Sequence, residues 1–186
     1  PTVLIGTSGQ RGCFTEDVVR AMARSCERPV IMPFSNPSDL SEAVPEDLLR
    51  WTDGRALVAT GSPFAPVEVG GRSVRIGQGN NVLVFPGLGL GVLLGGVRVV
   101  TDEMLTAAAF TLSAKVTDAE LASGMLFPAV SRLREVSAEV AAVVIANSRG
   151  AAVTATPPAA LVDAVRRRMW VPRYEEYVAE TGDAAE

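Results

Sequence analysis

Three short runs of apolar and β-branched residues near the start of the chain each end in a loop rich in Gly, Ser, Asn or Pro. The runs are residues 2–5, 29–34 and 56–60. A short apolar run that is bounded by turn residues is typical of a buried strand. The pattern therefore predicts three strands of a parallel sheet, whose two faces are both covered.

The segments between these runs have the spacing of helices. After Thr15, which can cap a helix, apolar residues recur on one helical face. They are Val18, Val19, Met22 and Cys26. Pro45 suits the first turn of a second helix that continues to Trp51. An alternation of strand, helix, strand, helix and strand predicts an α/β fold with a doubly wound parallel sheet.

Beyond residue 80 the pattern changes to helices alone. The apolar stretch 82–94 is about 13 residues long and contains Pro86 and three glycines. It is too short for the ~20 residues that cross a bilayer, so it predicts a closely packed buried helix and no membrane span. A second helical face is expected over 101–114 and consists of Met104, Leu105, Ala108 and Leu112. Thr117 with Glu120 predicts a capping box. Another stripe is formed by Leu133, Val136, Val140, Val143 and Val144.

These shifts divide the chain into three parts. Residues 1–80 form the α/β part, in which Gly70 and Gly71 suggest a small hairpin, and residues 81–150 form an all-helical segment. Residues 151–186 are interpreted as a linker and a C-terminal extension, because 151–160 are rich in Ala, Thr and Pro. The aromatic residues Trp170 and Tyr174 in this extension are expected to make packing or subunit contacts.

Composition excludes several kinds of chemistry. The chain has a net charge of −4, which argues against nucleic-acid binding, and no histidine, which excludes His-dependent triads and His-ligated metals within it. Its two cysteines, Cys13 and Cys26, are expected to be packing residues in a reducing, cytoplasmic setting. The single lysine, Lys115, is expected to be a solvated charge.

The loops that follow the strands are the candidate binding sites, because ligands of such sheets bind at the carboxyl ends of the strands. After the first strand, Gly6-Thr7-Ser8-Gly9 could let a cofactor approach exposed amides, or could be an ordinary turn. After the second, Asn36 could bind a carboxylate or carboxamide, although the residues alone favour an Asx-type turn over this role. Asn80 and Asn81 precede the apolar helix. A helix cap needs only one such side chain, so the two adjacent amides favour a binding role.

Other polar residues are given simpler interpretations. The acidic residues between 39 and 47 are taken to favour the start of a helix. They are Asp39, Glu42, Glu46 and Asp47. Ser8 and Ser62 lack a neighbouring base that could activate them as nucleophiles. No catalytic residue and no metal ligand is therefore assigned to the chain.

Several motifs, taken in order, resemble the C-terminal part of the malic enzymes. They are Pro1-Thr2-Val3-Leu4-Ile5-Gly6, Phe14-Thr15, Glu27-Arg28-Pro29, Ser35-Asn36-Pro37, Gly61-Ser62-Pro63-Phe64, Gly77-Gln78-Gly79-Asn80-Asn81 and Phe85-Pro86-Gly87. The similarity extends from residue 1 to about 150, and more weakly over 170–177. It implies that the chain holds the second half of a Rossmann-like NAD(P)-binding domain, followed by helices that pack with a substrate domain.

The resemblance also implies an activity and a set of contacts. Malic enzymes oxidise and decarboxylate L-malate to pyruvate and CO2 with NAD or NADP and with Mg or Mn. Gly6, Thr7, Ser8 and Gly9 would lie along the cofactor, together with Asn36. Asn80 and Asn81 would contact the nicotinamide and the malate carboxylate.

The family's acid/base pair, metal ligands and glycine-rich loop match no residue of this chain. The expected partners are therefore L-malate or pyruvate, the first half of the enzyme, and further copies in a dimer or tetramer. We also expect the edge of the first strand to be uncovered in the chain on its own. Three alternatives stay open: a malolactic enzyme, a different 2-hydroxy-acid dehydrogenase, and a non-catalytic fragment or assembly module.

Overall fold

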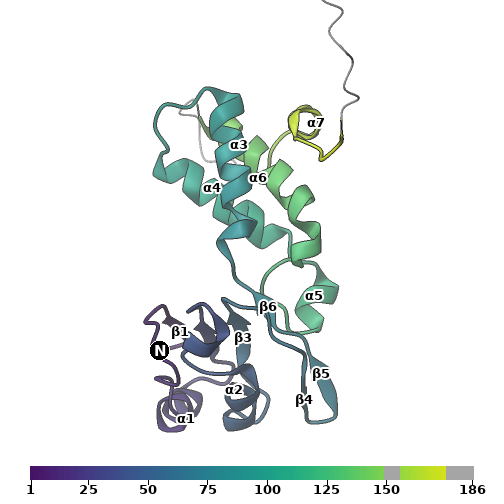
Figure 1. Ribbon diagram of the computed structural model, residues 1–186. Helices are drawn as coiled ribbons and strands as arrows, with labels where there is room; N and C mark the ends of the chain where they lie inside the picture. The colour runs from purple at the N-terminus through teal and green to yellow at the C-terminus, as the bar shows by residue number, and fades with distance from the viewer. Residues whose placement is uncertain (149–155, 175–186) are drawn as a thin grey trace, which may run out of the picture.

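A four-stranded parallel sheet forms one end of the molecule in the computed structural model, which describes residues 1–148 and 156–174 (Figure 1). The three predicted strands are present as β1 (Val3–Gly6), β2 (Val30–Pro33) and β3 (Leu57–Thr60). The two predicted helices between them are α1 (Glu16–Ser25) and α2 (Pro45–Trp51). The sequence prediction of a parallel α/β fold is therefore confirmed. Thr15 is the N-cap residue of α1, although its side chain makes no capping hydrogen bond.

The sheet has one strand more than the sequence predicted. Strand β6 (Gly77–Gln78) pairs parallel to β3, in a segment for which the sequence predicts no strand. Two residues, one of them glycine, carry no hydrophobic pattern, so this strand could not be predicted. Strands β4 (Val67–Val69) and β5 (Arg72–Val74) form the expected hairpin, with Gly70 and Gly71 at positive φ in its turn.

One hydrophobic core lies between the sheet and helices α1 and α2. Val19 and Met22 of α1 and Leu48 and Leu49 of α2 are buried in it, against Ile31 of β2. Strand β1 is an edge strand, because it is the first in the order β1-β2-β3-β6, and its outer edge pairs with no other described strand. Val3 and Ile5 of this edge strand are exposed, as expected from the sequence.

The second half of the described chain is helical and extends away from the sheet (Figure 1). It begins with the 3₁₀ turn η2 (Asn81–Leu83), and η1 (Ser38–Leu40) and η3 (Val130–Arg132) are similar short turns. The helices are α3 (Phe85–Gly95), α4 (Asp102–Ala114), α5 (Asp118–Ala122), α6 (Leu133–Asn147) and α7 (Ala159–Arg168). Helix α6 is the central one, since α3, α4 and α7 all pack against it.

Helices α3 and α6 approach each other closely because glycines line their contact. A Cβ on Gly87 would lie 2.8 Å from the carbonyl oxygen of Ser137, and one on Gly91 would lie 2.8 Å from that of Ala141. The predicted close packing of this apolar segment is therefore confirmed, but the prediction that it is buried is wrong. Only one face of α3 is covered, and Phe85 and Leu93 on the rest of its surface are 60% and 79% exposed.

The predicted capping box at the start of α5 is confirmed and belongs to a larger network. Glu120 accepts hydrogen bonds from the backbone N–H of Thr117 and of Ala129, at 2.8 and 2.9 Å. Arg132 pairs with both Glu120 and Glu135. Burial alone would raise the pKa of Glu120, but these donors, together with the Arg132 charge, lower it. The network holds α5 against the start of α6.

Several smaller expectations are corrected by the structure. Lys115 is not a solvated charge, because its Nζ lies 2.6 Å from Glu139 on α6. Cys13 is exposed, so it is not a packing residue, and both cysteines are free. Leu105 is also exposed, because the buried face of α4 is formed instead by Met104, Ala107, Ala108 and Thr111.

The C-terminal part of the chain is described only in part. Residues 149–155, which include the first half of the expected linker 151–160, lie outside the described residues, as does the end of the tail, residues 175–186. Helix α7 packs on α6 through Val162 and Val165. Trp170 and Tyr174 are exposed, so neither side chain packs within the described part of this chain. No helix among the described residues is long and apolar enough to cross a membrane.

The glycines of α3 offer a matched pair of substitutions. Gly91→Ala should lower the free energy of unfolding by about 1–3 kcal/mol, since its methyl group would meet the α6 backbone. Gly89→Ala should raise it by up to about 1 kcal/mol, because Gly89 is exposed with open space around it and alanine favours a helix. Urea unfolding of both variants measures the difference, and equal effects would contradict this view of the α3–α6 contact.

Candidate functional site

The loops after all four parallel strands lie at one edge of the sheet, because the strands run in the same direction. The sites predicted from the sequence are in these loops. Residues 7–9 follow β1, residues 35–37 follow β2, and Asn80 and Asn81 follow β6. The loop after β3 begins with Gly61 and Ser62. Hydrogen bonds join these loops to one another.

A buried carboxylate joins the β1 loop to the β2 loop. Glu42 has no exposed surface. Its Oε1 atom accepts hydrogen bonds from the backbone N–H of Ser8 at 2.7 Å, from the Ser8 hydroxyl at 2.9 Å and from the Ser35 hydroxyl at 2.5 Å. Its Oε2 atom accepts one from the backbone N–H of Ser35 at 3.3 Å. Donors from the loops after two strands thus converge on one side chain.

Ser35 extends this connection to the next residue of the β1 loop. While its hydroxyl donates to Glu42, the same oxygen accepts a hydrogen bond from the backbone N–H of Gly9 at 2.8 Å. The N–H groups of Ser8 and Gly9 are therefore already bonded within the protein. They are not free to bind a phosphate in the way that the sequence suggested for this loop. Thr7 and the open surface of Gly9, with no atom within 4 Å of an added Cβ, stay accessible to a ligand.

A second hydrogen bond joins the β2 loop to the β3 loop. The hydroxyl of Ser62 donates to Oδ1 of Asn36 at 2.6 Å, while Nδ2 of Asn36 donates weakly to the carbonyl of Phe34 at 3.3 Å. Gly61 is needed beside this pair, because a Cβ there would lie 2.2 Å from the Phe34 carbonyl oxygen. Asn36 is exposed, and the two hydrogen bonds hold its amide in one orientation at the surface.

The two adjacent asparagines have different surroundings. Asn80 is the N-cap of η2, and its Oδ1 accepts a hydrogen bond from the backbone N–H of Val82 at 2.9 Å. Asn81 is exposed, and its side-chain amide bonds to no other residue in the described part of the chain. The capping interpretation thus accounts for Asn80 alone, and Asn81 is free to meet a ligand.

Electrostatically, Glu42 is a charge without a cation. Burial alone would raise the pKa of its carboxyl, but the hydrogen bonds from Ser35 and Ser8 lower it from 4.5 to about 2. No ion pair connects it to an arginine or lysine within residues 1–148 and 156–174. Glu42 is therefore ionised at neutral pH and is stabilised by dipoles alone.

The interpretation of Glu42 as a helix-favouring charge is wrong. Helix α2 begins at Pro45, and only Glu46 and Asp47 lie in its first turn. Asp39 lies in η1, and the segment at Glu42 instead pairs with the β1 side, where the backbone N–H of Phe14 donates to the Glu42 carbonyl at 3.0 Å. Nothing in the local pattern marks this residue, because its partners come from positions 34 and 7 residues earlier.

Metal ligands are not assigned to this chain. Among residues 1–148 and 156–174, no three Cys, Asp or Glu side chains gather in a way that could hold a metal ion. Glu42 has both oxygens engaged by protein donors. No step that requires a metal is therefore derived from the described residues.

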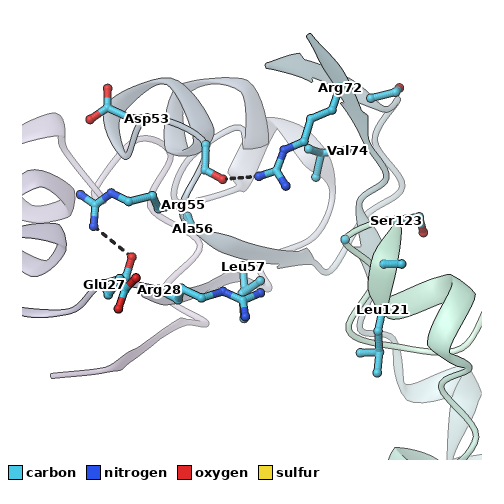
Figure 2. Close-up of a pocket in the computed structure, with 14 residues that line it drawn as sticks. Glu27, Arg28, Asp53, Arg55, Ala56, Leu57, Arg72, Val74, Leu121 and Ser123 are labelled. Carbon is cyan, nitrogen blue, oxygen red and sulfur yellow. Dashed lines mark hydrogen bonds between the residues drawn. The ribbon is translucent and has the colours of Figure 1, made fainter. Parts of the chain in front are cut away.

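A pocket of about 520 Å³ lies away from these loops (Figure 2). It is lined at the start of β3 by Ala56 and Leu57, and across from them by Ser123 after α5. Two of its arginines serve the fold. Arg55 donates to the carbonyl of Glu27 at 3.0 Å, and Arg72 donates to that of Gly54 at 2.7 Å. The pocket is at the amino end of β3, so it is separate from the carboxyl-end loops.

The low pKa of Glu42 predicts a pH-dependent contribution to stability. A folded-state pKa of about 2, below the ordinary 4.5, means that ionised Glu42 stabilises the fold above pH 4.5 and that this contribution is lost as the pH falls towards 2. Glu42→Gln should therefore lower the free energy of unfolding by about 2 kcal/mol at neutral pH. The difference from wild type should narrow below pH 4.5.

Chemical unfolding at a series of pH values measures this difference. Glu46→Gln is the matched control, because Glu46 is an exposed carboxylate in the first turn of α2. A Glu42→Gln difference that stays constant down to pH 2 would contradict the assignment of an ionised, hydrogen-bonded carboxylate.

Comparisons of this chain with protein families and with individual proteins both find malic enzymes. Residues 1–149 match the family described as malic enzyme, NAD binding domain. The NAD-dependent malic enzyme of Photorhabdus laumondii is 49% identical over 179 residues, which cover 95% of this chain and 32% of that protein. That of Pseudomonas aeruginosa, strain PAO1, is 48% identical over 182 residues, with the same coverage. This chain therefore spans about a third of the length of these relatives.

A solved structure supports the fold. The malic enzyme of Entamoeba histolytica superposes with a TM-score of 0.63 at 21% identity, over 90% of this chain and 33% of that one. The family match covers the strands, their loops and helices α1 to α6. With its parallel sheet and the order of its loop motifs, the chain belongs to the malic enzyme family, within the part that forms the NAD-binding domain.

Proposed function

We propose that this chain is the cofactor-binding portion of an enzyme that oxidises L-malate and decarboxylates the product to pyruvate and CO2 with reduction of NAD. The observation that carries the proposal is the joined set of loops at the carboxyl edge of the sheet, in a chain of this family. NAD is favoured over NADP because the relatives compared above are named NAD-dependent malic enzymes.

The four loops offer different contacts to a dinucleotide. The proposed cofactor residues are Gly6, Thr7, Ser8, Gly9, Asn36 and Asn80. Gly6 is buried against Glu42, and Ser8 has its donors engaged, so these two residues support the loop from within. Thr7, Gly9 and the amide of Asn36 lie at the surface, where they can contact the cofactor directly.

Asn80 and Asn81 are proposed to bind at the substrate end of the site. Oδ1 of Asn80 is held by the N–H of Val82, which leaves its amide N–H groups to donate to a carboxamide or carboxylate. Asn81 has a full amide available at the surface. When bound, NAD supplies the acceptor for the hydride of malate. The residues of this chain bind and orient, and none of them is proposed to move a proton.

The rest of the proposal concerns what lies outside these residues. The ligands of a divalent Mg or Mn ion and the acid/base groups would be supplied by the part of the enzyme that precedes the matched region in the family. We expect an assembly of two or four copies and a cytoplasmic location, in keeping with the two free cysteines.

The test is an assay of the full-length polypeptide that carries this chain, with L-malate, NAD and Mg. We expect malate-dependent reduction of NAD with one pyruvate formed per NADH, and weaker activity with NADP. Formation of lactate without net NADH would favour a malolactic enzyme instead. Saturable NAD binding without turnover would leave only the binding role, and neither binding nor turnover would favour a non-catalytic module.

Asn81→Ala tests the substrate end of the site. A substrate carboxylate would lose a positioned donor, so malate turnover should fall more than tenfold. The temperature of unfolding should not change, since the Asn81 amide is exposed and contributes no hydrogen bond to the described part of the fold. Steady-state kinetics and thermal unfolding provide the two measurements, and unchanged kinetics would remove Asn81 from the site.

A further inference from the structure

The position of Glu42 has a consequence beyond stability. Its carboxylate is fully buried, so it touches neither a cofactor nor a substrate. Yet all four of its donors come from Ser8 and Ser35, which directly precede Gly9 and Asn36. Two surface residues proposed to meet the cofactor are thus attached, through one neighbour each, to the same buried group.

The fit around the carboxylate is close. A Cβ on Gly6 would lie 2.6 Å from Cδ of Glu42 and 2.7 Å from the ring of Phe14. On the other side, the segment of Glu42 is held by the backbone N–H groups of Gly12 and Phe14, at 3.2 and 3.0 Å. The side chain therefore has one available place, between the end of β1 and the end of β2.

The hydrogen-bonding capacity of the site requires an ionised group. Oε1 accepts three bonds and Oε2 accepts one. The two backbone N–H partners can only donate, and the hydroxyls of Ser8 and Ser35 already accept hydrogen bonds from the N–H groups of Gln10 and Gly9. A glutamine at this position would put an NH2 group against a donor at one end or the other. The two loops would then separate or rotate, because at least one of their donors would lose its acceptor and face the NH2 group instead.

We propose that Glu42 is a positioning residue for the cofactor: by binding Ser8 and Ser35 together, it sets the separation between the β1 loop and the Asn36 turn to fit one bound NAD. This inference rests on the function proposed above. It assigns a role in affinity to a residue that makes no contact with the ligand.

A positioning role and a structural role differ in their kinetics. A residue that only stabilises the fold changes the fraction of enzyme that is folded, and so the maximal rate and the unfolding temperature. The KM of the folded fraction then stays the same. A residue that sets the spacing of two binding loops raises the KM for NAD and the Kd for NADH in the folded enzyme itself.

The experiment compares Glu42→Gln with the matched control Glu46→Gln in the full-length polypeptide that carries this chain. For Glu42→Gln we expect a KM for NAD and a Kd for NADH, measured by fluorescence, that are at least tenfold higher, with a KM for malate within twofold of wild type. Glu46 is exposed in the first turn of α2, so the control should match wild type. A lower unfolding temperature with unchanged values for NAD and NADH would overturn the inference.

Ser35→Ala provides a second route if Glu42→Gln does not fold. It removes the hydroxyl that bonds to both Glu42 and the N–H of Gly9, whereas the backbone N–H of residue 35 and both donors of Ser8 keep the carboxylate bonded, so the KM for NAD should rise three- to tenfold. Adding it to Glu42→Gln should give no further rise, since both act through one connection. An unchanged KM in Ser35→Ala would overturn the inference. A wild-type enzyme that does not reduce NAD with malate would instead overturn the proposed function.

Discussion

A single buried negative charge determines how the loops at the carboxyl ends of the strands are held together. Moving a carboxylate out of water is costly unless hydrogen bonds replace the lost solvent. Here the replacement comes entirely from backbone and hydroxyl dipoles on two loops, with no cation among the described residues. The hydrogen bonds to Glu42 therefore hold each loop in place, and because both loops bond to the same carboxylate they also fix the two loops relative to each other.

Close packing at this edge of the sheet explains three glycines that otherwise suggest ligand binding. The glycine at position 6 leaves room for Glu42 and Phe14, and Gly61 leaves room for the Phe34 carbonyl. Gly79 likewise leaves room for the ring of Phe34, which packs edge to face on Phe127. At these three positions the missing side chain makes space for the protein itself. Gly9, in contrast, has no atom within 4 Å of an added Cβ.

The sequence predicted the parts of the structure that depend on local pattern. The runs before Gly6, Ser35 and Gly61 became parallel strands, because apolar runs and turn residues describe strand and loop without reference to the rest of the chain. The two-residue strand β6 and the buried carboxylate could not be found in this way. Both depend on partners far along the chain, and a Glu near a helix start is indistinguishable in sequence from a residue that favours the helix dipole.

Local reasoning placed the candidate residues on loops that the structure brings to one edge of the sheet, but it did not predict the hydrogen bonds of each side chain and amide. Asn80 is used as a cap while Asn81 is free, and the amides of Ser8 and Gly9 face inward. These distinctions depend on the direction of single N–H groups, which spacing along the chain does not record.

Helix α3 begins four residues after Asn81, and its glycine face leaves no space between its backbone and that of α6. Beside these glycines the contact is filled by the β-branched side chains of Val140 and Val144, which have little rotamer freedom. The position of α6 therefore fixes where α3 begins. Asn80 and Asn81 are tied in this way to the helical part of the chain, whereas the loops of Ser8 and Ser35 are tied to Glu42.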